Sequence, residues 1–171
     1  MTPEFSRMVR ARPLPPHEVT IEAGEAERAA LATRFDVVAI HSLNAAVTLV
    51  ADGDAVDATG TMTADLVQLC AVSEEEFDVR IEEPLALRFV PEARQVDPEE
   101  EAELPGDEPD EIEFTGDSFD LGEAVAQTLG LAIDPYAEGP NADAVRRHAG
   151  IVPEGEAEGP LAELLRGLKP N

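Results

Sequence analysis

The stretch from Leu43 to Leu66, LNAAVTLVADGDAVDATGTMTADL, decides how this chain folds. Apolar and β-branched residues lead up to Asp52-Gly53-Asp54, a turn sequence typical of a β-hairpin. After the turn, apolar or small residues occupy every second position from Val56 to Leu66, and aspartate or threonine occupies the positions between them. This period of two predicts a strand with one face in the core and the other in solvent.

The pattern changes after Asp65, because Val67 and Leu69 make the polar face apolar as well. The strand is therefore expected either to enter the middle of the sheet or to change phase at a bulge. Apolar residues then occupy alternate positions, namely Phe77, Val79, Ile81, Leu85, Leu87 and Phe89, so a long antiparallel strand should follow. Pro84 is expected at an edge of the sheet or at a bulge.

Helices are predicted on both sides of these strands. Residues from Glu25 to Phe35 are good helix formers, and short strands are expected before them near residues 5–9 and 19–22. A second helix should run from Asp120 to Ile133, because Asp120 is a suitable N-cap with Glu123 three residues later. Shorter helical segments are expected at residues 142–148 and 160–168.

A long acidic run interrupts the pattern. No lysine or arginine occurs between Arg94 and Arg146, and the first part of this interval mixes carboxylates with proline. Such a segment buries too little apolar surface to order itself, so residues 97–113 are expected to form a mobile acidic loop, with Ile112 and Phe114 beginning the return to structure. The predicted fold is α+β, a mainly antiparallel β-sheet packed by two or three helices, with one domain over residues 1–136 and a C-terminal tail over residues 137–171.

Composition limits the class of protein. The chain has 171 residues, of which 43% are hydrophobic, and this suits one domain with tails. A single cysteine excludes an internal disulfide and a multi-cysteine zinc site. No export signal or long apolar run is recognisable, so a cytoplasmic protein without membrane contact is expected.

The formal net charge of −25 is the strongest global constraint. A surface this negative is repelled by phosphate backbones, so direct binding to DNA or RNA is disfavoured. The same field attracts basic proteins, and a basic partner is the natural inference. The simpler alternative is that the acidity only keeps the protein soluble.

Few residues suggest chemistry of their own. His17, His41 and His148 have no neighbours at metal-ligand spacing, so surface or structural histidines are expected. Cys70 ends an apolar strand and is expected to be buried, and without a basic neighbour its thiolate should not be favoured. The acidic run lacks calcium-loop spacing, and no nucleophile elbow or phosphate-binding glycine loop occurs. No catalytic, metal or cofactor-binding residue is assigned.

Several blocks, in order, resemble the bacterial YceD family. They are Cys70-Ala-Val-Ser73-Glu-Glu-Glu-Phe77, Ile81-Glu-Glu-Pro84-Leu-Ala-Leu-Arg-Phe89, the acidic insert, Asp120-Leu-Gly-Glu123 and Gly159-Pro160-Leu161-Ala162. The resemblance extends from about Val47 to the end of the chain. Many family members carry a Cys-x-x-Cys pair, in which Cys70 occupies the first position and Ser73 stands at the second, so a role for that pair is not transferable. The chain resembles a cysteine-poor, alphaproteobacterial branch.

The resemblance implies a non-enzymatic role in the accumulation or processing of large-subunit ribosomal RNA, and hence in ribosome biogenesis. Because the charge disfavours RNA, the chain is expected to act on the RNA indirectly, through a basic ribosomal protein or assembly factor. Capture of such a partner should weaken steeply with salt. The candidate partner-binding residues are Glu99, Glu100, Glu101, Glu103, Asp107, Glu108, Asp110, Glu111, Glu113, Asp120 and Glu123.

Two rival functions remain open. The first is an acidic domain that binds a small molecule or a divalent ion. The second is an enzyme whose carboxylates, such as Glu82, Glu83 and Asp134, converge in the fold. A closed pocket with paired buried carboxylates would favour the rivals, whereas an open sheet face beside the acidic segment would favour partner binding.

Overall fold

A computed structural model describes residues 2–92 and 109–150 of the chain. Its elements, in order, are β1 (Met8–Arg10), β2 (Val19–Glu22), α1 (Glu25–Arg34), β3 (Ala39–Asp52), β4 (Ala55–Leu69), β5 (Glu76–Pro91), β6 (Asp110–Phe114), β7 (Ser118–Asp120), α2 (Leu121–Ala132) and α3 (Ala142–His148). This is the α+β fold that the sequence predicts. None of the helices in the described ranges is long and apolar enough to cross a membrane.

Contacts divide the chain into two compact units. Among the described residues, the first unit comprises residues 2–68, 78–92 and 109–135, and the second comprises residues 69–77 and 136–150. The first unit holds the sheets and helices α1 and α2. The second holds the turn between β4 and β5, and helix α3. The predicted helix at residues 160–168 lies outside the described residues.

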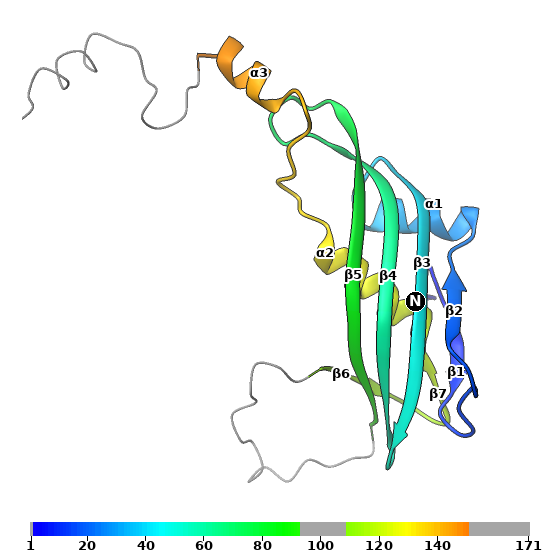
Figure 1. Cartoon of the computed structure of the whole chain (residues 1–171). Coiled ribbons are helices and arrows are strands. Elements are labelled where there is room, and N and C mark those ends of the chain that lie inside the picture. The colour runs from blue at the N-terminus through cyan, green and yellow to red at the C-terminus, as the bar shows by residue number, and fades with distance from the viewer. Residues whose placement is uncertain (1, 93–108, 151–171) are drawn as a thin grey trace, which may run out of the picture. The chain divides into compact units, whose positions relative to one another are not determined.

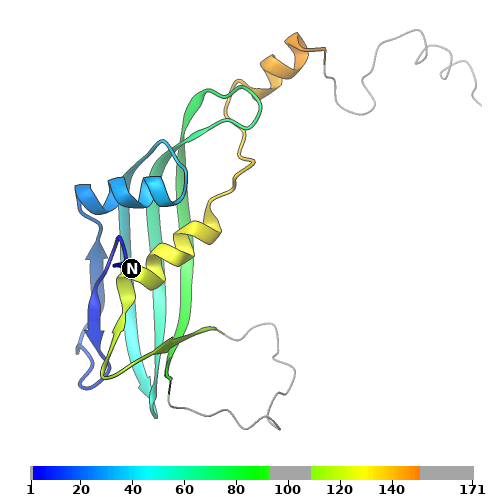
Figure 2. The same cartoon turned by 180° about the vertical axis from the view of Figure 1, so that it is seen from behind.

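The first unit is built on a five-stranded sheet with the order β2-β3-β4-β5-β6. Figures 1 and 2 show α1 and α2 on the same face of this sheet, while the opposite face carries no helix. A separate two-stranded sheet joins β1 to β7, with Val9 opposite Phe119. The described part of the first unit is therefore a layer of helices on a sheet whose other face is open.

The hairpin forms where the sequence predicts it. Strands β3 and β4 pair antiparallel from Ala39 to Asp52, and Gly53 adopts the positive φ of 59° that the tight turn requires. On β4 five of the six predicted core positions are buried, including Val56, Met62 and Leu66, and Gly60 is half-buried. The alternation of side chains thus places the predicted apolar face against the helices.

The bulge lies in β3 rather than in β4. Ile40 pairs with Leu66 and Ser42 pairs with Asp65, so His41 is the extra residue. Strand β4 keeps its phase and lies between β3 and β5, with Gln68 buried and Leu69 exposed. Of the two alternatives left open by the sequence, passage into the middle of the sheet is the one that β4 adopts.

Strand β5 is the long strand that the alternating apolar residues predict. Asp65 on β4 pairs with Arg80 on β5, and Asp57 pairs with Arg88, so the two strands run in opposite directions. Ile81, Leu85, Leu87 and Phe89 are buried. The prediction of a mainly antiparallel sheet is confirmed, with one exception at its far edge.

That exception is β6, which pairs parallel with β5 from Leu87↔Asp110 to Pro91↔Phe114. Residues 110–113 were expected to belong to the mobile acidic loop, and this part of the expectation is wrong. The alternation Glu111-Ile112-Glu113-Phe114 turns the carboxylates outward and leaves Phe114 buried beside Phe119, with 5.8 Å between the ring centroids. The rest of the predicted loop lies outside the described residues.

Helix α2 begins as predicted. The carboxylate of Asp120 accepts a hydrogen bond from the backbone N–H of Glu123 at 3.1 Å and caps the first turn. Leu121, Val125 and Leu129 are buried, so the helical face predicted from the sequence packs on the sheet. Helix α1 follows its predicted range to within a residue.

Candidate functional site

Strand β5 has an outer side that is only partly covered. Strand β6 pairs with residues Leu87–Pro91, and no other described strand lies on that side of β5. Residues Asp78–Ala86 therefore form an unpaired strand edge within the first unit, which we call the open edge. Pro84 lies on it, as the sequence predicts for a proline in a strand. An unpaired edge presents a row of backbone N–H and C=O groups to whatever approaches it.

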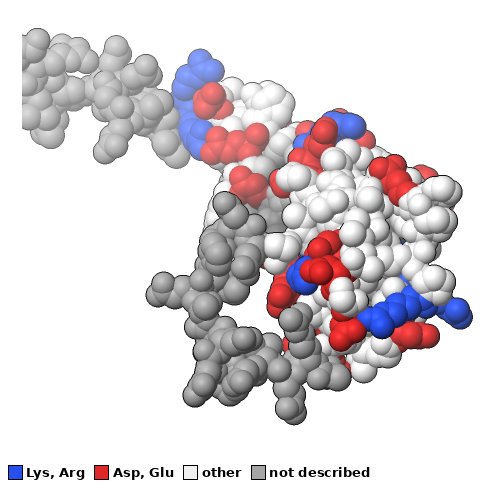
Figure 3. Space-filling model, turned by 60° about the horizontal axis from the view of Figure 1, so that its bottom comes forward, with Lys and Arg blue, Asp and Glu red and all other residues white. Residues whose placement is uncertain are grey.

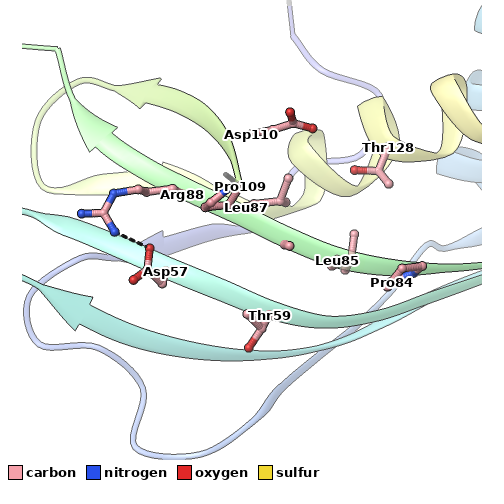
Figure 4. A pocket seen from close by; sticks show the side chains of 10 residues that line it. Asp57, Thr59, Pro84, Leu85, Leu87, Arg88, Pro109, Asp110 and Thr128 are labelled. Carbon is pink, nitrogen blue, oxygen red and sulfur yellow. Dashed lines mark hydrogen bonds and ion pairs between the residues drawn. The ribbon is translucent and has the colours of Figure 1, made fainter. Parts of the chain in front are cut away.

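A groove of about 680 Å³ lies at the end of the open edge. In Figure 4, Leu85 and Leu87 point from β5 to the side on which Asp110 and Thr128 lie, whereas Thr59 lies on the other side of the strand. The groove therefore borders β5, the start of β6 and helix α2. Its remaining lining residues are Asp57, Pro84, Ala86, Arg88 and Pro109. The groove combines apolar walls with a few polar groups, as ligand- and peptide-binding sites do.

Carboxylates that have no partner among the described residues gather on β5 and β6. No ion pair or side-chain hydrogen bond among the described residues involves any of six acidic side chains, which are Asp78, Glu82, Glu83, Asp110, Glu111 and Glu113. All but the half-buried Glu83 are exposed. Since nothing described neutralises them, they make this side of the first unit electronegative.

The arginines of β5 do not offset this charge, because each already has a partner. Arg80 binds Asp65 at 3.0 Å, and Arg88 binds both Asp57 at 2.6 Å and Asp52 at 2.8 Å. Hydrogen bonds and charge from these two aspartates raise the pKa of Arg88 above its ordinary value. On the face shown in Figure 3, most of the exposed arginine surface adjoins Asp or Glu.

The structure separates the predicted partner-binding residues into three groups. Asp110, Glu111 and Glu113 lie together on β6, and Asp110 also lines the groove. Asp120 and Glu123 lie at the start of α2. The other six, Glu99, Glu100, Glu101, Glu103, Asp107 and Glu108, lie outside the described residues.

Asp120 and Glu123 are engaged in structural contacts. Besides capping α2, Asp120 accepts hydrogen bonds from the Ser6 hydroxyl at 2.6 Å and the Arg7 backbone N–H at 2.8 Å. Glu123 pairs with Arg34 of α1 at 3.0 Å. These two carboxylates fasten the N-terminal segment and α1 to α2, and this role is evident in their contacts. Partner contact by either of them stays a prediction.

Two of the carboxylates suggested for an enzyme, Glu82 and Glu83, do not converge. Glu82 and Glu83 are neighbours on β5, so their side chains point to opposite faces of the strand. The backbone oxygen of Asp134 accepts a hydrogen bond from the buried Gln68 amide at 3.0 Å. Gln68 is the only buried polar residue in the described ranges. Within the same ranges, no group of three or more His, Cys, Asp or Glu residues is placed so that it could hold a metal ion. The three histidines are exposed, as predicted.

Cys70, in the second unit, is buried as predicted, with 2% of its surface exposed. Its sulfur accepts hydrogen bonds from the backbone N–H groups of Val72 at 3.4 Å and Ser73 at 3.3 Å. Hydrogen bonds from Ser73, and to a lesser degree from Gly139 and Val72, lower the pKa of the thiol to about 7. The expectation that the thiolate would not be favoured is therefore wrong, because hydrogen-bond donors replace the missing basic neighbour.

The open edge and the groove were not predicted from the sequence. Their position depends on how far β6 extends along β5, and this is a contact between segments that are distant in the chain. One local signal was present. The charged Glu83 interrupts the apolar alternation of β5 and Pro84 follows it, and such residues are typical of strands that lie at an edge.

Residues 58–159 match the family model for YceD, described as large ribosomal RNA subunit accumulation protein. The chain belongs to the YceD family. The match begins in β4 and includes β5, β6, β7, α2 and α3, so it contains the open edge, the groove and the Cys70 turn. The description of the YceD family names no reaction. No curated protein matches the chain, and no solved structure matches it.

Proposed function

We propose that this YceD protein is a non-enzymatic accessory factor for the accumulation of large-subunit ribosomal RNA. The observation that carries the proposal is the family match over residues 58–159. The protein acts in ribosome biogenesis in the bacterial cytoplasm, where ribosomal RNA and ribosomal proteins are assembled.

The protein acts on the RNA through a basic ribosomal protein or assembly factor. Direct binding to RNA is disfavoured because the net charge of −25 opposes a phosphate backbone. A basic protein gains from the same field. The carboxylates of β5 and β6 that have no partner within residues 2–92 and 109–150 support this choice, and so does the sheet face on which Figure 1 shows no described helix of the first unit.

Depletion of the protein tests this proposal. The measurement is the ratio of large-subunit to small-subunit ribosomal RNA in depleted cells, with and without an intact copy of the gene. We expect the ratio to fall on depletion and to recover with the intact copy. An unchanged ratio in cells that grow poorly would contradict the proposal and favour binding of a small molecule or divalent ion at the groove beside β5.

A further inference from the structure

We propose that the open edge of β5 binds an extended, Lys- or Arg-bearing segment of the partner protein by strand addition. This inference rests on the proposed function, because it specifies how a basic partner is held. The segment continues the sheet beyond the first residue of β6, alongside residues Asp78–Ala86. Its backbone pairs with β5, and its basic side chains meet the carboxylates of β5 and β6.

The backbone supplies the first part of the argument. The open edge is nine residues long, so it offers about 30 Å of unpaired strand, enough for an added strand of ordinary length. The same side of β5 already accepts a strand, because β6 pairs with Leu87–Pro91. The groove beside Leu85 and Thr128 gives room for side chains of the incoming segment at the point where β6 begins.

The side chains supply the second part. Along the open edge, Asp78 and Glu82 point to the face without helices, and Glu83 points to the opposite face. Successive side chains of an added strand point to opposite faces of the sheet, and on each face they would meet carboxylates. Asp110 and Glu111 extend the negative charge to the end of the groove. Lysine and arginine fit these positions, whereas acidic side chains are repelled.

The same features disfavour other occupants. A second copy of this chain would bring its own acidic edge and its own Pro84, which lacks a backbone donor. The chain's carboxylate-rich stretch from Glu99 to Glu108 carries charge of the same sign as the edge. A basic segment from another protein is the occupant that both the backbone and the charge favour.

Three peptides of seven residues test the mode of binding to the full-length protein. The first alternates lysine with threonine, the second has glutamate in place of lysine, and the third is the lysine peptide with N-methyl groups on two adjacent central amides. The two methyl groups block both edges of the peptide strand but leave its charge unchanged. Binding is followed by amide chemical shifts and hydrogen exchange in NMR spectra.

We expect only the first peptide to bind well, with shift changes and slower exchange at residues Asp78–Ala86. Its affinity should fall steeply as salt rises from about 0.05 to 0.3 M. Equal binding of the N-methylated peptide would overturn strand addition. Equal binding of the glutamate peptide, shifts that map elsewhere, or absence of binding at millimolar concentration would overturn the proposal as well.

A matched pair of variants tests the residues. The triple variant Asp78→Asn, Glu82→Gln and Glu83→Gln removes three carboxylates from the open edge. The control Glu18→Gln, Glu22→Gln and Glu25→Gln removes the same charge from exposed positions on or beside β2 and α1, at the other edge of the sheet. We expect affinity for the lysine peptide to fall about tenfold in the first variant and less than twofold in the control. Equal losses would show that net charge alone matters.

The outcome is separate from that of the depletion experiment. If depletion lowers the large-subunit RNA but the lysine peptide does not bind at the open edge, the proposed function stands and strand addition fails. If the peptide binds as described but the RNA ratio is unchanged, the edge recognises basic segments outside ribosome assembly, and the proposed function fails.

Discussion

At the scale of single residues, hydrogen bonds set the chemistry of Cys70. Its thiol has no cationic neighbour at bonding distance in the described residues, yet its pKa is lowered to about 7 by donors from Ser73, Val72 and Gly139. The turn that contains Val72 and Ser73 is closed by hydrogen bonds between the backbones of Cys70 and Glu74 at 3.0 Å and of Glu75 and Cys70 at 2.8 Å. The Ser73 side chain, together with backbone N–H donors, therefore lowers the pKa of the buried Cys70 thiol and favours the thiolate.

We expect the thiol of Cys70 to titrate near pH 7, and Ser73→Ala to raise its pKa toward the ordinary value. The measurement is thiolate absorbance near 240 nm as a function of pH, with Cys70→Ser as the control that lacks the transition. A midpoint near 9 in the unaltered protein would contradict this prediction, as would a midpoint that Ser73→Ala does not move.

The same shift predicts how stability depends on pH. The pKa of Cys70 is lower in the folded protein, about 7, than its ordinary value of 9.0. The folded state therefore binds the proton less tightly, and the thiolate's contribution to stability is fully present above about pH 9 and lost as pH falls through 7. Cys70→Ser should remove this part of the pH dependence and leave that of the carboxylates at lower pH.

At the scale of elements, the hairpin of β3 and β4 depends on close approach of its two backbones. A Cβ atom added to Gly60 would lie 1.9 Å from the backbone oxygen of Ala46 and 2.9 Å from the Cα of Val47. These atoms belong to β3, which is held in register by its pairing along β4. The only remedy for such a clash is displacement of the strand itself.

We expect Gly60→Ala to lower the free energy of unfolding by more than about 2 kcal/mol, because it forces β3 away from β4. Urea unfolding followed by circular dichroism provides the measurement. Thr61→Ala, at the exposed position next to it, is the control and should change stability by less than about 1 kcal/mol. Similar losses in the two variants would mean that the strands move apart easily.

Elements whose signals are local could be predicted from the sequence. The period of two in β4 and the N-cap at Asp120 each arise from neighbouring residues, so both were predicted with nearly correct bounds. Strand β6 was missed because its stability comes from pairing with β5 and from Phe114, which packs beside Phe119. Its acidic composition alone favours a loop.

The candidate site was only partly predictable for the same reason. Composition gives Asp110, Glu111 and Glu113, which are exposed on β6, the same predicted role as Asp120 and Glu123, and it cannot distinguish the two sets. The latter two are engaged by Ser6 and Arg34, which are distant in the sequence. Whether a carboxylate is available to a partner depends on such long-range contacts.

At the scale of the whole molecule, the net charge of −25 opposes the compact state. Folding brings these charges closer together, and their mutual repulsion costs free energy that dissolved salt can screen. The ion pairs of the described residues act in the opposite direction, but most are partly exposed, such as Arg12–Asp54 and Arg80–Asp65, and exposed pairs contribute little. Repulsion should therefore dominate the response to salt.

We expect the melting temperature to rise as NaCl increases from about 0.02 to 0.3 M, by about 2–4 °C for each kcal/mol of repulsion that is screened. Scanning calorimetry at constant pH measures this, with MgCl₂ at equal ionic strength as the comparison. Equal shifts in the two salts indicate general screening. A much larger shift with Mg²⁺ would instead indicate specific binding of a divalent ion, and a melting temperature that falls with NaCl would show that the ion pairs outweigh the repulsion.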